Sequence, residues 1–225
     1  AGIQKVILAS SSEVYGEPLK NPIREEDITQ GKSVYAVSKL AGEELVKAYH
    51  AEFETLNFTV LRYFNTYGPY QIAQFVIPKF IRNVLNDKPP VIYGDGRQER
   101  SYNFSEDTAR GTVDALFSQE ANNTTMNIGN SNALISLKDL GELVIKICGK
   151  QNELEINIKN SFENTDRTAK REIYQRYCST KRAKEIIGYE PKISLEEGIN
   201  KIIKVGVLQP KWATSEREYT IDDYL

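Results

Sequence analysis

The chain is poor in the residues that most metal and redox sites require. It has one histidine, His50, and two cysteines, Cys148 and Cys178, and the two cysteines are not at metal-ligand spacing. This scarcity argues against histidine-based catalysis and against a metal site, so we expect no metal cofactor. Because so few cysteines, with no pairing pattern, are typical of reducing compartments, we also expect a cytoplasmic protein.

A long apolar run and a strong net charge are absent as well. No segment approaches the ~20 consecutive apolar residues that a membrane-spanning helix needs. The formal net charge is −2, and 27% of the 225 residues are charged and 40% hydrophobic, which is an ordinary balance for a globular protein. We therefore expect neither a membrane nor a nucleic acid among the partners.

The most informative segment that is present is the run YAVSK, which places Tyr35 and Lys39 four residues apart. In a helix, residues at this spacing share one face, one turn from each other. A tyrosine phenol titrates near ~10 in water. A neighbouring ammonium favours the phenolate, which makes a tyrosine usable in proton transfer. Taken alone, such a pair is more often part of an amphipathic helix with a buried tyrosine and a solvated lysine.

The preceding segment favours the catalytic interpretation. Residues 5–10 form a short apolar run that is typical of a buried parallel strand, and hydroxyl residues at Ser10, Ser11 and Ser12 end it, followed by Glu13. Ligands of open α/β sheets bind at the carboxyl ends of the strands. A serine hydroxyl beside a tyrosine and a lysine suits chemistry at a carbinol or carbonyl carbon.

Further motifs follow in order along the chain: RYFNTYGP at 62–69, YGDG at 93–96, Arg100, EDTA at 106–109 and KRAKEIIGYEP at 181–191. Together with SSSEVYG at 10–16 and YAVSK, this series resembles the extended short-chain dehydrogenase/reductase family, in its branch of NAD-dependent sugar-nucleotide epimerases, dehydratases and decarboxylases. The match runs from the first residues to about Ile202. The resemblance implies an NAD cofactor and a nucleoside-diphosphate sugar as substrate.

The resemblance also implies the fold class, which is α/β with a Rossmann-like, doubly wound parallel sheet and a smaller α/β substrate-binding lobe. The family's Gly-rich turn, G-x-x-G-x-x-G, which receives the dinucleotide pyrophosphate at a helix N-terminus, does not occur in this sequence. The first residue lies just before what looks like the family's fifth strand. On the order of 100 residues of the family pattern precede that point. We therefore expect an N-terminally truncated chain, with only the C-terminal half of the Rossmann-like sheet and little of the cofactor cradle.

Hydrophobic periodicity and helix caps predict the secondary structure. The expected elements are strands at 5–10, 57–64, 91–93, 124–128 and 153–158, and helices from after Ser33 to about Phe53, at 74–86, at 105–118 with Ser105 as N-cap, at 137–148, at 179–187 and at 194–205. Residues 160–177 are predicted to be a loop, and the tail from Gln209 shows no clear period.

The resemblance divides these elements between two parts of the family fold. Residues 1–70 are expected to be the C-terminal part of the NAD-binding Rossmann domain, and a later segment, about 101–130, returns to it. Residues 71–100 and 131–225 are expected to form mainly the sugar-nucleotide-binding lobe.

The catalytic residues implied by the resemblance are Ser11, Tyr35, Lys39 and Glu13. Ser11 would bond the sugar 4-oxygen, and Tyr35 would exchange the proton of that hydroxyl while hydride moves between sugar C4 and the nicotinamide. Lys39 would hold the nicotinamide ribose hydroxyls, and Tyr63 would lie near the nicotinamide. Glu13 is acid-capable at a position where dehydratases carry the base for C5, because a 4-ketone acidifies that carbon. A surface role for Glu13 is the alternative.

The substrate contacts that the resemblance implies are spread more widely. Two arginines, Arg100 and Arg176, would bind the diphosphate, since guanidinium forks suit phosphate oxygens. Arg97 competes with Arg100 for this register, and the segment at 166–171 lacks the Pro-Gly-Asp common in epimerases. The remaining candidates are Ser12 and Asn65 at strand ends, and Val91 and Tyr93 flanking the nucleobase.

Two classes of function remain open. The leading hypothesis is an enzyme that modifies a nucleoside-diphosphate sugar through a transient 4-keto intermediate, as a 4-epimerase, a 4,6-dehydratase or a decarboxylase. The alternative is a non-catalytic remnant or partner subunit that binds a sugar nucleotide without turnover. Because members of the family pair through a helix bundle that includes the YxxxK helix, the resemblance also implies a homodimer.

Overall fold

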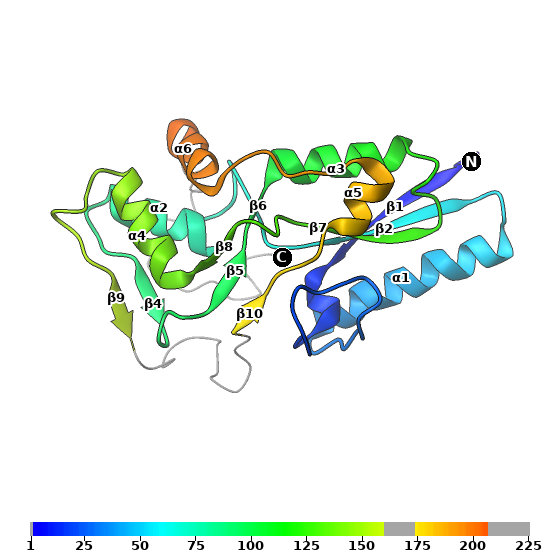
Figure 1. Cartoon of the computed structure of the whole chain (residues 1–225), viewed down its shortest axis with the longest axis horizontal. Helices are drawn as coiled ribbons and strands as arrows, with labels where there is room; N and C mark the ends of the chain where they lie inside the picture. Colours follow the sequence, from blue (N-terminus) through cyan, green and yellow to red (C-terminus); the bar gives the residue numbers. More distant parts are fainter. Residues whose placement is uncertain (1, 160–173, 207–225) are drawn as a thin grey trace.

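The computed structural model describes residues 2–159 and 174–206, and a parallel sheet forms the right-hand part of the molecule in Figure 1. Strands β1 (Lys5–Ser11), β2 (Asn57–Tyr63) and β7 (Thr124–Ile128) pair in the order β1-β2-β7 (Figure 1). Both pairings are parallel. Parallel neighbours require crossover connections, so helices cover the sheet.

Helices lie on both faces of this sheet. Helix α1 (Val34–Glu52) covers one face, and α3 (Ser105–Phe117) and α5 (Lys181–Ile187) cover the other (Figure 1). Ser33 sets the start of α1, because its Oγ accepts the N–H of Ala36 at 3.1 Å. This arrangement confirms the predicted α/β class with a doubly wound parallel sheet.

A second group of helices packs beside the sheet, on the left of Figure 1. Its members are α2 (Val76–Leu85), α4 (Leu137–Ile147) and α6 (Leu195–Val205). Their apolar faces share one core, whose fully buried members include Ile81, Val84, Leu140, Val144 and Ile199. Burial of each such side chain contributes about 1.5–3 kcal/mol, so these helices form a lobe with a core of its own.

A 3-10 turn and seven short strands complete the described architecture. The turn is η1 (Ser12–Tyr15), directly after β1, and the strands are β3 (Thr66–Tyr67), β4 (Val91–Tyr93), β5 (Glu99–Ser101), β6 (Asn103–Phe104), β8 (Leu134–Ser136), β9 (Asn157–Lys159) and β10 (Gln175–Arg176). They pair as β3-β6, β4-β9 and β10-β5-β8. The last of these sheets carries Arg100 and Arg176 in register on neighbouring strands.

Most predicted elements are confirmed, and three local predictions are wrong. Ser105 does not cap α3: the N-cap is Phe104, without a side-chain hydrogen bond. Ser105 instead packs so closely on Gly68 that a side chain at Gly68 would collide with its hydroxyl.

The strand expected at 153–158 is reduced to β9, because the N–H groups of Glu153 and Leu154 both donate to Lys150 O in a turn. The loop expected at 160–177 contains β10 at its end. The rest of that loop, at 160–173, and the tail from Gln209 lie outside the described residues.

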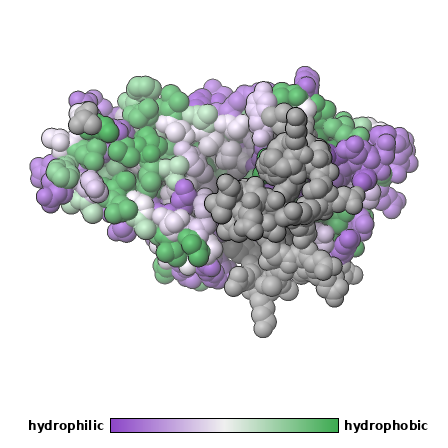
Figure 2. Space-filling view, turned by 180° about the vertical axis from the view of Figure 1, so that it is seen from behind, coloured by the Kyte–Doolittle hydropathy of each residue, from purple (hydrophilic) through white to green (hydrophobic). Residues whose placement is uncertain are grey.

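The outer side of α1 is largely apolar. Val34, Val37, Leu45, Tyr49 and Phe53 are each more than half exposed, and their spacing places them along one side of the helix. Figure 2 shows apolar side chains gathered on the face behind that of Figure 1, toward the end of the molecule that holds β1 and α1. Within residues 2–159 and 174–206, no helix combines the length and apolarity that crossing a membrane demands.

Candidate active site

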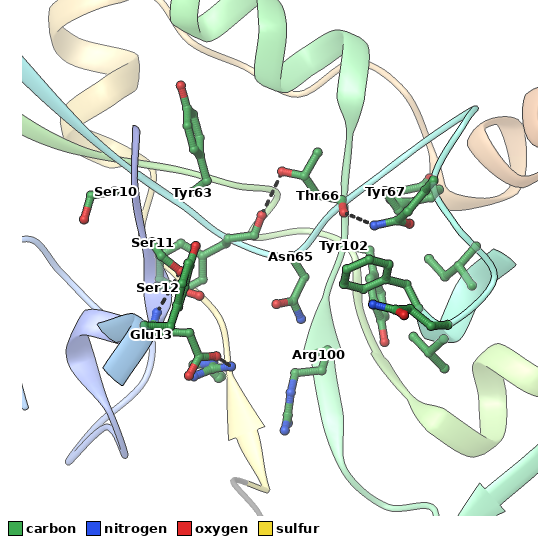
Figure 3. A pocket seen from close by; sticks show the side chains of 18 of the residues that line it. Ser10, Ser11, Ser12, Glu13, Tyr63, Asn65, Thr66, Tyr67, Arg100 and Tyr102 are labelled. Carbon is green, nitrogen blue, oxygen red and sulfur yellow. Dashed lines mark hydrogen bonds and ion pairs between the residues drawn. The ribbon is translucent and has the colours of Figure 1, made fainter. Parts of the chain in front are cut away.

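A cavity of about 710 Å³ opens where β1 and β2 end and the helical lobe begins (Figure 3). This volume is in the range of small-molecule sites. The residues that line it are Ala9, Ser10, Ser11, Ser12, Glu13, Tyr35, Lys39, Tyr63, Phe64, Asn65, Thr66, Tyr67, Gln71, Gln74, Phe75, Val76, Ile77, Gln98, Arg100, Tyr102, Leu137 and Arg176.

The end of β1 supplies a hydroxyl and a carboxylate. Ser11 is the last residue of β1, and its Oγ accepts the N–H of Glu13 at 3.2 Å, which starts η1 directly after the strand. The turn brings Glu13 into the cavity, where its carboxylate is ion-paired with Arg176 of β10 (Figure 3). Ser11 and Ser12 are both buried at this edge of the sheet.

The first turns of α1 supply the tyrosine and the lysine. Tyr35 is 52% exposed, so its hydroxyl is accessible to a ligand. Lys39 Nζ lies 5.5 Å from the centre of the Tyr35 ring and donates to Ala9 O at 2.9 Å. This last bond ties the ammonium to β1, two residues before Ser11, so that α1 and the end of β1 meet at one edge of the cavity.

Two other tyrosines near this edge have hydroxyls that are already paired. Tyr15 is buried and its OH donates to Asn127 Oδ1 at 2.7 Å; burial raises the pKa of Tyr15 to about 12. Tyr63 lines the cavity, but its OH is 2.8 Å from Thr112 Oγ1, and burial raises its pKa above the ordinary value. Figure 3 shows the Tyr63 hydroxyl pointing away from Glu13. Of these three tyrosines, Tyr35 is therefore the most exposed.

Both predicted arginines line the cavity. Arg176 is only 8% exposed, and its Nε and Nη1 are buried without a hydrogen-bond partner among the described residues. Arg100 lies across from Glu13 in Figure 3, and its Nη1 donates to Glu99 O at 2.8 Å. Buried guanidinium donors such as these two nitrogens of Arg176 are costly to leave unpaired, so an anionic group of a ligand is their natural acceptor.

Two glutamines that the motifs did not single out also face the cavity. Gln71 donates through Nε2 to Thr66 O at 3.1 Å, and Gln98 donates through Nε2 to Tyr93 O at 3.5 Å. The Oε1 atoms of both are buried, and within the described part of the chain they have no hydrogen-bond partner. They therefore accept readily from ligand hydroxyl or N–H groups. The only signal in the sequence is the place of Gln98 between the Gly-Asp-Gly segment and Arg100.

The cavity brings most of the predicted site residues together, and two stay apart. Ser12 and Asn65 line it beside the catalytic candidates. Val91 and Tyr93 do not line it, since both lie on β4, which pairs with β9, and Lys159 Nζ sits 5.8 Å from the Tyr93 ring centre. Gln98, Tyr102 and Leu137, from other segments, do line the cavity.

Comparison with known proteins gives a family match along nearly the whole chain. The model of the family described as GDP-mannose 4,6 dehydratase matches residues 2–202. A UDP-glucuronate 4-epimerase of Thermodesulfobacterium geofontis is 30% identical over 204 residues, which cover 90% of this chain and 59% of that protein. A UDP-glucuronic acid decarboxylase 4 of Arabidopsis thaliana is also 30% identical, over 89% of this chain and 44% of its own length.

Solved structures agree with this match. The UDP-glucuronic acid 4-epimerase of Bacillus cereus, in complex with UDP-glucuronic acid and NAD, is 30% identical and superposes with a TM-score of 0.78. The alignment covers 91% of this chain and 62% of that one. The chain thus spans less than two thirds of each of these proteins.

Proposed function

Because the chain belongs to the GDP-mannose 4,6 dehydratase family, we propose that it acts in an NAD-dependent enzyme that modifies a UDP-sugar through a transient 4-keto intermediate. The observation that carries this proposal is that one cavity is lined both by Ser11, Tyr35 and Lys39 and by Arg100 and Arg176. The first group suits a carbinol, and the second suits a diphosphate.

The residues around Tyr35 fit the nicotinamide end of NAD. The Lys39 ammonium and the hydroxyl of Tyr35 lie at the carboxyl edge of a parallel sheet, which is where dinucleotides bind in this class of fold. Lys39 would hold the ribose hydroxyls, and Tyr63 would form part of the wall beside the nicotinamide. Bound NAD supplies a hydride acceptor for sugar C4 and a donor that returns the hydride.

Residues of the chain itself transfer the proton of the sugar 4-hydroxyl. Ser11 bonds the 4-oxygen, and Tyr35 takes the proton of the 4-hydroxyl as the C4 hydrogen leaves with its electron pair. The sugar is then a 4-ketone. Return of the hydride to the opposite face of C4, with the proton from Tyr35, gives the 4-epimer without net oxidation. Lys39 lies beside Tyr35, with its Nζ 5.5 Å from the centre of the ring.

Among the possible reactions, we favour 4-epimerisation because Glu13 is paired with Arg176. A dehydratase needs a carboxylate that is free to remove the C5 proton, whereas an epimerase does not. Decarboxylation of a uronate sugar is the second candidate, supported by the likeness to the plant decarboxylase.

Glu13→Gln is expected to preserve most 4-epimerisation and to abolish any 4,6-dehydration, as measured by NMR of the sugar products. Equal loss of both reactions would refute a base role for Glu13.

Arg100→Met is expected to weaken the binding of UDP about 10- to 100-fold, because each hydrogen bond to a charged group is worth about 1.5–3 kcal/mol. Arg97→Met is the matched control, since Arg97 is highly exposed and pairs with Asp95 outside the cavity. Titration calorimetry with UDP measures both. Equal effects of the two substitutions would contradict the assignment of Arg100 to the diphosphate.

The proposal is tested by measuring the NAD content of the purified protein and then incubating it, supplied with NAD, with UDP-glucuronate, UDP-glucose and their dTDP, GDP and CDP counterparts. Conversion of a UDP-sugar to its 4-epimer supports the enzyme. Binding of UDP-sugars without conversion would instead support the alternative, a partner subunit or remnant that binds the nucleotide sugar without turnover.

The division of the chain and its assembly are part of the same proposal. Residues 1–70 and about 101–130 are proposed to belong to the NAD-binding domain, and 71–100 and 131–225 mainly to the lobe that binds the nucleotide sugar. The apolar outer side of α1 is proposed to be the surface through which two copies pair. Light scattering of the wild-type protein and of Leu45→Glu tests the pairing.

A further inference from the structure

A buried charged cluster lies directly behind the cavity and takes no part in the chemistry described above. It is built around Arg62 of β2 and Glu43 of α1, which are 6% and 1% exposed. Ser10 and Tyr15 complete the cluster. Of these four residues, only Ser10 lines the cavity.

Hydrogen bonds connect all four members of the cluster. Arg62 Nε donates to Glu43 Oε1 at 3.0 Å, and Arg62 Nη2 donates to Glu43 Oε2 at 2.7 Å, which makes a two-pronged ion pair. Arg62 Nη1 donates to the hydroxyl of Tyr15 at 2.9 Å and to Glu25 O at 3.0 Å. Ser10 Oγ donates to Glu43 Oε1 at 2.5 Å. Every nitrogen of the guanidinium group therefore has a partner.

Each member of the cluster is close in sequence to a residue of the candidate site. Glu43 follows Lys39 by one turn of α1, and Tyr35 precedes Lys39 by one turn, so Tyr35, Lys39 and Glu43 form one stripe on the helix. Ser10 directly precedes Ser11. Tyr15 ends the turn η1 that carries Glu13, and Arg62 directly precedes Tyr63. The guanidinium group thus joins the three segments that carry the site residues.

Stability alone does not account for such a cluster. A buried ion pair loses hydration when the chain folds, and well-packed apolar side chains are often as stabilising. Burial by itself would raise the pKa of Glu43, but the hydrogen bonds from Arg62 and Ser10 outweigh burial and keep that pKa below its ordinary value. What a two-pronged pair adds is orientation, because it fixes both the distance and the rotation of the two groups.

We propose that Arg62 and Glu43 are positioning residues that hold α1, and with it the hydroxyl of Tyr35, at the correct place relative to Ser11 and the sugar C4. This inference rests on the proposed function. Misplacement of a reacting group by about 1 Å can cost about 100-fold in rate, which is the scale of effect that such an anchor protects.

The test uses a double variant, Glu43→Met with Arg62→Met, which removes both charges together and so leaves no unpaired ion in the core. We expect its melting temperature to stay close to that of the wild type and its affinity for UDP to be unchanged. The kcat, calculated from the concentration of protein that binds UDP, is expected to fall about 10- to 100-fold, with little change in KM. Hydrogen exchange of the amides in residues 36–39 is expected to become faster.

Two single variants sharpen the result. Arg62→Lys keeps the charge but cannot form the two-pronged pair, so it is expected to show the same loss of kcat. Glu44→Gln is the matched control, since Glu44 is the neighbouring residue on α1 and pairs at the surface with Lys47. It is expected to leave kcat and the exchange rates unchanged.

A double variant that folds, binds UDP and turns over at the wild-type rate would overturn the proposal, as would a loss of activity that only follows the loss of folded protein. Unchanged hydrogen exchange in residues 36–39 would overturn it independently of any activity. Absence of turnover in the wild type would instead refute the proposed function, and the exchange measurement would still decide whether the cluster anchors α1.

Discussion

Tyr35→Phe is expected to lower kcat for the conversion of a UDP-sugar by roughly 100- to 10,000-fold, the range that a single general acid–base group contributes. The substitution removes one hydroxyl from a half-exposed ring that lies 5.5 Å from the Lys39 ammonium. Because Tyr35 is not among the residues proposed to bind the diphosphate, the affinity for UDP is expected to stay within about twofold of the wild type. Steady-state kinetics and titration calorimetry measure the two quantities.

Tyr49→Phe is the matched control for this substitution. Tyr49 lies on the same helix, is 56% exposed, and does not line the cavity. Its variant is expected to retain wild-type turnover. Wild-type activity in Tyr35→Phe would refute the assignment of the proton-exchanging group, whereas equal losses in both variants would indicate damage to α1 and not to the chemistry.

Asp107→Ala is expected to lower the free energy of unfolding by about 2–5 kcal/mol, because each of two backbone N–H groups that loses its buried acceptor costs about 1–3 kcal/mol. Asp107 is fully buried on α3, and its carboxylate accepts the N–H groups of Lys192 at 3.0 Å and Ile193 at 2.9 Å. The carboxylate also accepts from Arg110 at 2.6 Å. The substitution leaves the N–H groups of Lys192 and Ile193 without this acceptor and frees the segment that leads into α6, whereas Arg110 keeps its bond to Glu190 O. Urea denaturation followed by circular dichroism measures the change.

The neighbouring carboxylate provides the comparison. Glu106 pairs with Lys201 at 2.8 Å on the surface, where an ion pair is worth about 0–1 kcal/mol. Glu106→Ala is accordingly expected to change the free energy of unfolding by no more than about 1 kcal/mol. A loss in Asp107→Ala as small as this would show that the buried carboxylate does not anchor the segment before α6.

The helices and the longer strands could be predicted from the sequence because their signals are local. The alternation and apolar runs at 57–64 and 124–128 predict strands, and the spacing in 74–86 predicts an amphipathic helix; all three are present. Backbone geometry alone sets these periods, so a window of ten residues contains the information. The strands of two or three residues, such as β3 and β6, have no period to detect.

In the candidate site, too, some residues have a local signal in the sequence and others have none. The YAVSK run and the serines at the end of β1 indicate Ser11, Tyr35 and Lys39 from their own segments, since the spacing along one helix and the end of one strand decide their placement. The partners of these residues are set by contacts between distant segments. Arg176 meets Glu13 across 163 residues, and Arg62 meets Glu43 because β1 and β2 pair beneath α1.

Taken by itself, the sequence determined the class of fold, the order of its main elements and the chemical character of the candidate site, because these depend on local periodicity and on motifs of fixed spacing. The tertiary structure alone decided which charges are paired, that Val91 and Tyr93 lie away from the cavity, and that Gln71 and Gln98 face it with unpaired carbonyls. Such pairing depends on which side chains the packing of remote segments buries together, and no local pattern in the chain records it.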